Sequence, residues 1–565
     1  MPTRDEVVAQ LTGPGGPFEV VEEDVGGVRM KVYRERMRSL REVAALARGY
    51  GDREFLVHGD RRLTYAEALD TVDAVSAALR DRFGVRPGDR VAVLSANNPE
   101  WCLTFWATVN LGAVLVGLNG WWKADEVVYG LQDSGAVVLV ADRDRFARVA
   151  DRLGEAPALR AVFLVDGEPP AGDDRVHRFE ELTAGPAPGP PTEPIGEDDP
   201  AVIFYTSGTT GRPKGAISTH RSMIANLQNT VFLTLVNGML SGGDGGGLPT
   251  ASLLTSPLFH VSGCHSGLVV GTLAGIKLVM PVGRFDPEKA LRLIQDERIT
   301  VWATVPTMVW RVCEHPASRE YDTSTVTTVA FGGSPSADEL QRKVRATFPN
   351  VRTTSNAYGL TESSSVATVI SGQDALERPA SVGRPLPVVD VRIAGPDGEP
   401  LPPGRTGEVL IRGPIVMPGY WGKPEATAAT VRDGWLHTGD LGHLDGDGFL
   451  YITDRAKDMI IRGGENVYCV EIENRLVEHP AVADAAVVGV PHPELGEEVK
   501  AIVQVEPGAA LTEDEVRDWV RATLADFKVP AHVELRDAPL PRNASGKLLK
   551  DVLRGRGQVS FAETM

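Results

Sequence analysis

Short apolar runs without polar alternation are the feature that most limits how this chain can fold. The clearest are Arg90–Ser95, Ala136–Ala141, Ala201–Tyr205, Ile276–Met280 and Thr300–Val305, and segments with helical spacing separate them. A strand that is covered on both faces of a parallel sheet carries apolar, often β-branched residues at every position. The runs therefore predict parallel sheets in an α/β fold.

The order of these patterns predicts several folding units. Residues 90–118 and 251–280 each read as strand, loop, helix, small-residue turn and strand, which suggests two related βαβ subdomains. Beyond about residue 385, alternating residues and turn signals predict a small antiparallel, β-barrel-like sheet. From Asp454 the pattern of strands and helices predicts a small α+β domain. We expect a large N-terminal domain over residues 1–453, a hinge at 454–458 and a C-terminal domain over 459–565.

Composition excludes several classes of function. A net charge of −18 disfavours a nucleic-acid partner, because the phosphate backbone attracts basic surfaces. The segment Phe105–Trp122 is apolar but contains two asparagines, so we expect a buried helix and strand rather than a membrane span. Four scattered cysteines without a C-x-x-C pair, and an N-terminus without an apolar leader, are typical of a cytoplasmic protein. The cysteines are Cys102, Cys264, Cys313 and Cys469.

A glycine-rich segment, YTSGTTGRPKGAIS, occupies Tyr205–Ser218. It follows a predicted buried strand and precedes a helical pattern that Thr219 is placed to cap. Such a loop can aim backbone N–H groups, hydroxyls and a lysine at a phosphate. However, no Ser or Thr follows Lys214, so the segment is not the common P-loop. Taken alone, it is either a phosphate-binding loop or a structural turn.

Six further motifs follow this segment along the chain. They are Ser256–Gly263, Phe331–Pro335, Asn356–Ser363, Gly434–Gly442, Asp454–Glu473 and Pro541–Lys550. With these motifs the chain resembles the adenylate-forming superfamily of acyl-CoA synthetases, peptide-synthetase adenylation domains and beetle luciferases, from about residue 40 to 550. It is most similar to bacterial acyl-CoA synthetases of the fatty-acid–CoA ligase type.

The resemblance implies an AMP-forming acid–thiol ligase. A carboxylic acid would react with ATP to give an acyl-adenylate and pyrophosphate, and the thiol of CoA would then displace AMP. The negative carboxylate must approach a polyphosphate, so cations and aimed N–H donors are needed. The resemblance therefore implies Mg²⁺, with ATP and CoA as co-substrates.

The resemblance also implies a nucleotide site. Thr209 and Glu362 would contact the metal, Thr361 the α-phosphate and Asp440 both ribose hydroxyls, and Arg455 would also reach the nucleotide. The phosphate loop would contribute Thr206, Ser207, Gly208, Thr209, Thr210, Gly211 and Lys214. The adenine would lie among Gly333, Ser334, Pro335, Asn356, Ala357, Tyr358 and Gly359.

The C-terminal motifs carry the predicted catalytic lysine and the thiol path. Lys547 would bridge the carboxylate and the α-phosphate, and it joins Glu362, Thr209 and His260 as the predicted catalytic residues. By the same resemblance, the small domain rotates about Lys457 after adenylation. Gly463, Gly464 and Glu465 would then line the path of CoA. Cys469 stands where many relatives have proline, which leaves the turn there undefined.

The predicted acyl pocket is rich in small residues. The resemblance places His260, Val261, Ser262, Gly263, Thr304, Val305, Gly332, Gly359 and Ser363 around it. Ser262 occupies a position that is aromatic in some aryl-acid ligases, so the pocket has room. We expect a bulky apolar acid, either a medium- or long-chain fatty acid or an alicyclic acid. His260 is not expected to bind a metal, because no carboxylate cluster accompanies it.

Three alternatives remain open at this point. The adenylate could pass to a carrier protein or a partner enzyme rather than to CoA. A luciferase-like monooxygenase would retain the same adenylation motifs, and an inactive nucleotide-binding protein would retain the fold. A homodimer is compatible with the sequence, whereas a nucleic-acid partner and a transmembrane segment are not expected.

Overall fold

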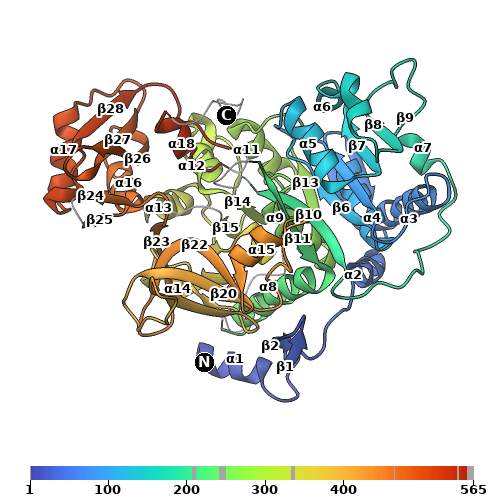
Figure 1. The fold of residues 1–565 in the computed structure, drawn as a ribbon, viewed down its shortest axis with the longest axis horizontal. Helices are drawn as coiled ribbons and strands as arrows, with labels where there is room; N and C mark the ends of the chain where they lie inside the picture. Colours follow the sequence, from blue (N-terminus) through green and yellow to red (C-terminus); the bar gives the residue numbers. More distant parts are fainter. Residues whose placement is uncertain are drawn as a thin grey trace.

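The computed structural model describes residues 2–206, 212–240, 250–332, 338–462, 465–543 and 546–555. The chain starts with α1 (Arg4–Thr12) and an antiparallel hairpin of β1 (Val20–Val25) and β2 (Val28–Tyr33). In Figure 1 this N-terminal segment lies below the main body.

The first sheet has seven strands in the order β11-β10-β6-β5-β7-β8-β9. Its pairs are parallel except β10 with β11, which flank the glycine-rich loop. The strands are β5 (Arg90–Leu94), β6 (Val114–Gly117), β7 (Val138–Asp142), β8 (Ala161–Val165), β9 (Val176–Arg178), β10 (Pro200–Thr206) and β11 (Lys214–Thr219).

The second sheet has nine strands in the order β18-β17-β16-β15-β14-β12-β13-β3-β4, and its centre from β3 to β16 is parallel. The strands are β3 (Glu54–His58), β4 (Arg61–Thr64), β12 (Ala251–Leu253), β13 (Lys277–Met280), β14 (Val301–Thr304), β15 (Thr328–Gly332), β16 (Thr353–Tyr358), β17 (Thr368–Ser371) and β18 (Arg384–Pro385). Each of the five apolar runs thus contains a strand of one of these two mainly parallel sheets.

Helices cover both faces of these sheets, as the apolar runs predict. Val91 and Val93 of β5 enter one hydrophobic cluster, whereas Ala92 and Leu94 enter another on the opposite face. The first cluster extends to Leu278 of β13, so helices between the sheets join them into one body. The helices are α2 (Leu40–Ala47), α3 (Tyr65–Asp81), α4 (Pro99–Asn110), α5 (Ala124–Ser134), α6 (Arg143–Phe146), α7 (Glu180–Thr183), α8 (His220–Leu240), α9 (Val261–Gly263), η3 (Cys264–Val269), α10 (Val270–Leu273), α11 (Pro287–Asp296), α12 (Pro306–Glu314), α13 (Asp338–Thr347) and α14 (Gly372–Glu377).

The predicted internal similarity is present as two parallel βαβ units. One is β5-α4-β6 in the first sheet, and the other runs from β12 through α9, η3 and α10 to β13 in the second. The helix and strand predicted within Phe105–Trp122 are the end of α4 and β6. No helix in the described ranges is long and apolar enough to cross a membrane.

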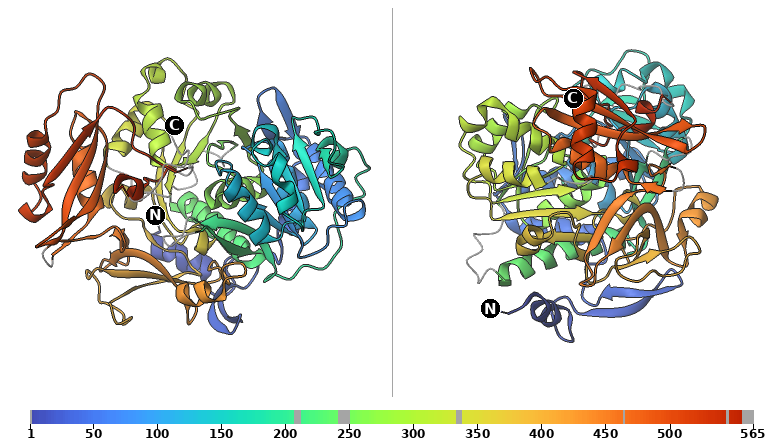
Figure 2. Two further views of the ribbon diagram at one scale, coloured as in Figure 1. Left: turned by 45° about the horizontal axis from the view of Figure 1, so that its top comes forward. Right: turned by 90° about the vertical axis from the view of Figure 1, so that its left-hand side faces the viewer.

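Two smaller sheets complete the chain. An antiparallel sheet holds β19 (Asp390–Ala394), β20 (Gly407–Arg412), β21 (Val431–Arg432), β22 (Trp435–Leu444) and β23 (Leu450–Arg455), with α15 (Pro424–Thr430) beside it. The C-terminal domain holds β24 (Ile460–Arg462), β25 (Glu465–Val467), β26 (Val482–His492), β27 (Gly496–Val505) and β28 (His532–Arg536), with α16 (Cys469–Val477), α17 (Glu513–Arg521) and α18 (Lys550–Leu553). Figures 1 and 2 show this domain as a separate lobe beside the second sheet.

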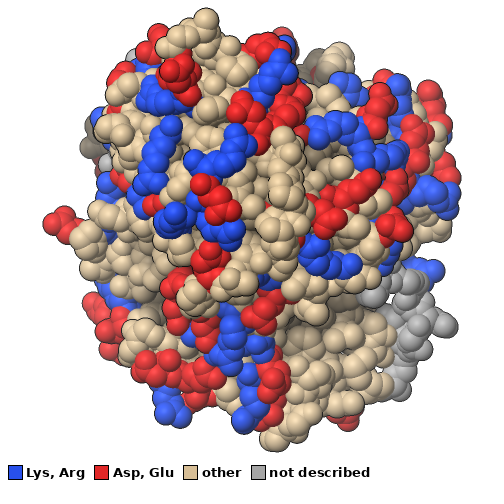
Figure 3. Space-filling view, turned by 90° about the vertical axis from the view of Figure 1, so that its right-hand side faces the viewer, with Lys and Arg blue, Asp and Glu red and all other residues tan. Residues whose placement is uncertain are grey.

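Charges of both signs are interspersed on the face formed by the first subdomain (Figure 3). This face therefore presents no broad surface of one charge.

Candidate active site

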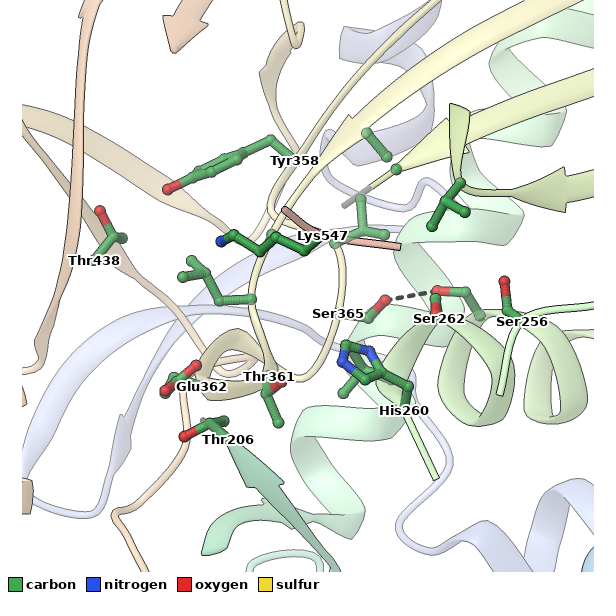
Figure 4. Close-up of a pocket in the computed structure, with 18 of the residues that line it drawn as sticks. Thr206, Ser256, His260, Ser262, Tyr358, Thr361, Glu362, Ser365, Thr438 and Lys547 are labelled. Atoms are coloured by element: carbon green, nitrogen blue, oxygen red, sulfur yellow. Dashed lines mark hydrogen bonds between the residues drawn. The ribbon is translucent and has the colours of Figure 1, made fainter. Parts of the chain in front are cut away.

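A cavity of about 1780 Å³ lies where the second sheet, the β19–β23 sheet and the C-terminal domain meet. Figure 4 shows part of its lining, with Lys547 extending into it beside Tyr358. Predicted site residues from both domains line it: Thr206, Lys214, His260, Val261, Ser262, Thr304, Val305, Gly332, Ala357, Tyr358, Gly359, Thr361, Glu362, Asp440, Arg455, Lys457 and Lys547.

Ten predicted residues lie outside the described part of the chain, so their roles stay predictions. They are Ser207, Gly208, Thr209, Thr210, Gly211, Gly333, Ser334, Pro335, Gly463 and Gly464.

Lys547 reaches the cavity on a tight turn of the C-terminal domain. Its backbone N–H donates to the Asn543 side-chain oxygen (2.9 Å), and the Asn543 N–H donates to the Lys547 carbonyl oxygen (2.8 Å). Gly546 has a φ of +77°, and a Cβ at this position would lie 3.1 Å from the Val305 side chain. Glycine suits both the left-handed backbone and the close approach. The turn therefore docks the lysine against the N-terminal domain.

The surroundings of Lys547 disfavour the charged form of its side chain. Burial and the neighbouring Arg455 lower the pKa of Lys547 to about 7, although Asp440 opposes the shift. Burial, with a contribution from Lys547, lowers the pKa of His260 to about 4. The His260 imidazole is therefore neutral near pH 7, and a carboxylate or phosphate would relieve the burial of Lys547.

This environment predicts a pH dependence. We expect kcat/KM for acid-dependent pyrophosphate release to fall as pH rises through about 7, because the free enzyme then loses the Lys547 proton. Lys547→Arg keeps its charge, so its slower reaction should not show this alkaline fall. Pyrophosphate release measured from pH 6 to 10 compares the two enzymes. Identical profiles would contradict the assignment of this ionisation to Lys547.

Asp440 is held from two sides at the cavity wall. Pairing of β22 with β23 places it opposite Arg455, whose Nε lies 3.3 Å from Asp440 Oδ1. The Tyr358 hydroxyl donates to Asp440 Oδ2 (2.7 Å). Burial and the carboxylate raise the pKa of Tyr358 well above its usual value, so the hydroxyl remains a donor. The arrangement fixes the carboxylate that is predicted to bind ribose.

Tyr420, which the sequence analysis missed, supports Glu362. Its hydroxyl donates to Glu362 Oε1 (2.8 Å), and the Met417 N–H donates to the Glu362 carbonyl oxygen (2.8 Å). Lys214 Nζ lies 5.3 Å from the centre of the Tyr420 ring, within the range of a cation–π contact. Tyr420 therefore connects the lysine of the glycine-rich loop to the predicted metal carboxylate. The hydrogen bond spans 58 positions, and nothing in the surrounding GYWGKPEAT indicates it.

The stem of the glycine-rich loop is anchored on α5, again through residues that sequence analysis missed. The Tyr129 hydroxyl donates to the Pro213 carbonyl oxygen (2.9 Å). Asp133 accepts from the Tyr205 hydroxyl (3.0 Å) and from Lys423 Nζ (2.6 Å). These bonds attach both flanks of the loop, at Tyr205 and Pro213, to α5.

The donors at this end of the cavity fit Mg²⁺. The Glu362 carboxylate and the Thr206 and Thr361 hydroxyls are hard oxygen donors on the cavity lining. Among the described residues, no group of three or more His, Cys, Asp or Glu side chains could hold a metal. Phosphate oxygens and water would therefore complete the coordination. When bound, the metal would neutralise charge on the polyphosphate.

Tyr420→Phe is expected to raise the Mg²⁺ concentration for half-maximal pyrophosphate release about tenfold, because partners of metal ligands tune metal affinity. The change removes the hydroxyl that holds Glu362 and keeps the ring beside Lys214. Mg²⁺ titration of activity, together with Mn²⁺ binding followed by electron paramagnetic resonance, measures the effect. Tyr321→Phe is the control, because it loses a 2.8 Å bond to Glu288 away from the cavity. An unchanged metal dependence in Tyr420→Phe would contradict the support of Glu362 by Tyr420.

Asn356 does not line the cavity, contrary to the prediction. Successive side chains of a strand point to opposite faces. Ser355 and Ala357 of β16 line the cavity, so Asn356 is buried on the other face of the sheet.

Three other predicted residues also lie away from the cavity lining. The Ser363 hydroxyl accepts from the Leu360 N–H (2.9 Å) within its own turn. Gly263 is buried so closely that a Cβ would lie 2.2 Å from the Pro257 carbonyl oxygen. Glu465 is exposed on β25, where it pairs with Arg462.

Cys469, which departs from the proline of many relatives, begins α16 and is buried. Its N–H donates to Asp454 Oδ2 (2.5 Å), and its thiol donates to the Asp458 carbonyl oxygen (3.1 Å). Proline has no N–H and could not make the first bond. Cysteine therefore ties the start of α16 to both ends of the predicted hinge.

The profile of the family described as AMP-binding enzyme matches residues 43–421, and that of the AMP-binding enzyme C-terminal domain matches residues 471–547. The chain belongs to the AMP-binding enzymes. A feruloyl-CoA synthase of Amycolatopsis is 40% identical over 88% of this chain and 95% of its own length. A Mycobacterium tuberculosis CoA ligase, named for a methyl-dioxo-octahydro-indenyl-propanoyl group, is 38% identical over 91% of this chain and 97% of its own. The ATP-bound MatB of Rhodopseudomonas palustris has a TM-score of 0.80 at 32% identity and covers 92% of this chain and 98% of its own.

These matches confirm the predicted superfamily and fold class. This AMP-binding enzyme is an acid–thiol ligase of the acyl-CoA synthetase type, a group that uses a carboxylic acid, ATP and CoA. The relatives are named for very different acids, so the substrate is a separate question.

Proposed function

We propose that this AMP-binding enzyme activates a bulky carboxylic acid, either a medium- or long-chain fatty acid or an alicyclic acid, and transfers it to CoA. The observation that carries the proposal is the size of the cavity that Lys547 enters. Small residues such as Ala303, Ala330 and Ala357 leave its floor unfilled. ATP would occupy the part of the cavity beside Asp440 and Lys214, and a short acid would leave the part beside these alanines without contacts. Filling that part with a larger apolar acid is favourable because it buries apolar surface.

In the first half-reaction, a carboxylate oxygen attacks the α-phosphorus of ATP and the bond to the bridging oxygen breaks, so pyrophosphate leaves. Lys547 would bridge the carboxylate and the α-phosphate, where its ammonium offsets the charge that develops in the transition state. Asp440 would orient the ribose. Lys214 would stabilise the departing pyrophosphate.

In the second half-reaction, the CoA sulfur attacks the acyl carbonyl carbon, and AMP leaves with the bonding electrons. The lysine turn occupies one wall of the cavity, so the C-terminal domain would have to withdraw to admit the thiol. β23 ends at Arg455 and β24 begins at Ile460, and Lys457 between them is the proposed pivot. Domain rotation of this kind separates two chemistries in one site.

The experiment that tests this function is acid-dependent pyrophosphate release over a panel of fatty, aromatic, alicyclic and polycyclic acids. Each reaction is run with and without CoA, and mass spectrometry follows the acyl products. We expect acyl-CoA with bulky acids and little turnover with acetate. Turnover with acetate alone would contradict the acid class. Adenylate that accumulates in the presence of CoA would favour transfer to a carrier protein, and light from a luciferin would favour a monooxygenase.

A further inference from the structure

The floor of the cavity is one face of four adjacent parallel strands, β12, β14, β15 and β16. Their registers place cavity-lining residues in rows across the sheet. One row is Ser252, Val301 and Thr328, the next is Ala303, Ala330 and Ser355, and the last is Gly332 and Ala357.

The rows lie at increasing depth from the chemistry. The row of Gly332 and Ala357 is at the carboxyl end of its strands, next to Val305, against which the Lys547 turn docks. Two residues of a strand span about 7 Å, so the second row lies about 7 Å deeper and the third about 13 Å deeper. The two deeper rows each cross three strands, so the floor is about 10 Å wide there. An unbranched alkyl chain cannot fill this width, whereas a ring system can.

The deeper rows carry hydroxyl groups that face the cavity. The Ser252, Thr328 and Ser355 hydroxyls have no hydrogen-bond partner among the described residues. In contrast, the Thr304 hydroxyl contacts the Met308 sulfur (3.3 Å), and that of Thr327 donates to the Thr300 carbonyl oxygen (3.2 Å). The first three are therefore available to a ligand.

The η3–α10 segment lies over this face of the sheet, and the two enclose the deeper part of the cavity as a slot. The slot is narrow on the β12 side. A Cβ on Gly267 would lie 2.7 Å from Leu254, and one on Gly271 would lie 2.7 Å from Leu278. The η3–α10 segment therefore packs directly on β12 and β13. A substrate that enters this slot displaces water from the serine and threonine hydroxyls. A purely hydrocarbon substrate would leave them unpaired, which is unfavourable.

We propose that the acid recognised here contains a ring system with oxygen substituents. One substituent would meet the hydroxyl of Ser355, about 7 Å from the row of Gly332 and Ala357, and another those of Ser252 and Thr328, about 13 Å from that row. The inference rests on the proposed function and narrows its acid class. A site that hydrogen-bonds a substrate oxygen rejects the analogue without that oxygen more strongly than a hydrophobic pocket rejects a missing methylene.

The test uses two acids with one skeleton, naphthylpropanoic acid and its analogue with a hydroxyl on the distal ring. We expect the wild-type enzyme to use the hydroxy acid with at least about tenfold higher kcat/KM in pyrophosphate release. Thr328→Val with Ser252→Ala should reduce that preference to within about twofold. Ser355→Ala tests the nearer row separately, with a vanillic-type acid against its unsubstituted benzoic analogue.

The outcomes separate this inference from the function on which it rests. If no acid supports pyrophosphate release by the wild-type enzyme, the proposed function fails. If both naphthyl acids react equally well, or the variants keep the full preference, the hydroxyl recognition is wrong while the ligase function stands. Thermal melting of each variant without acid shows whether it is folded, and a folded variant at either row decides the question.

Discussion

Lys547→Met is expected to slow acyl-adenylate formation about 10³-fold, the effect of removing a preorganised charge from a developing anionic transition state. Methionine matches the unbranched stem of lysine as far as Cε and lacks the ammonium group. The thioester half-reaction, started from synthetic acyl-adenylate and CoA, should retain most of its rate, because the proposed domain rotation withdraws this residue. Pyrophosphate release and acyl-CoA formation measure the two steps separately.

Lys528→Met provides the matched control on the same domain. Lys528 is paired with Glu471 (2.7 Å) and does not line the cavity, so its loss should leave both half-reactions intact. Equal losses in both half-reactions of Lys547→Met would show a structural role rather than one in adenylation. Undiminished pyrophosphate release would contradict the assignment altogether.

Asp440→Asn is expected to lower kcat/KM for ATP about 100-fold. A carboxylate makes hydrogen bonds worth about 1.5–3 kcal/mol each, and a tenfold change corresponds to about 1.4 kcal/mol. The amide would accept more weakly from ribose and would leave the Arg455 charge unpaired. Steady-state kinetics with varied ATP measures the change, and most of it should be in KM.

Asp390→Asn is the control for a carboxylate between two cations. Asp390 contacts Lys31 (2.8 Å) and Arg412 (2.9 Å) outside the cavity, so its replacement should lower thermal stability without raising the KM for ATP. The same behaviour in Asp440→Asn would mean that Asp440 only supports the fold.

Local sequence predicts the parallel sheets because a strand that is buried on both faces carries an apolar residue at every position. Val91 to Leu94 enter two clusters on opposite faces, and all four are apolar. The helix cap was equally local: Thr219 accepts from the Ser222 N–H (3.1 Å) at the start of α8. Such features depend on residues a few positions apart, so the sequence contains them directly.

The site was predictable only with the family resemblance. Lysine and arginine together number 58, so Lys547 carries no signal of its own. The resemblance singled it out, and in the structure Lys547 lines the cavity whereas Asn356 does not. A motif does not state which residues of a strand face a cavity. The roles of Tyr420 and Asp133 were not predicted, because their contacts join segments that are far apart in the chain. Only the fold brings those segments together.

The floor of small residues has a consequence for altering this enzyme. Each row lies at a fixed depth, and successive rows are two residues apart along the strands. A leucine in place of Ala330 would therefore close the cavity at the second row, and one in place of Val301 would close it at the third. The length of acid accepted could thus be chosen by the position of a single branched side chain, without touching the groups that perform the reaction.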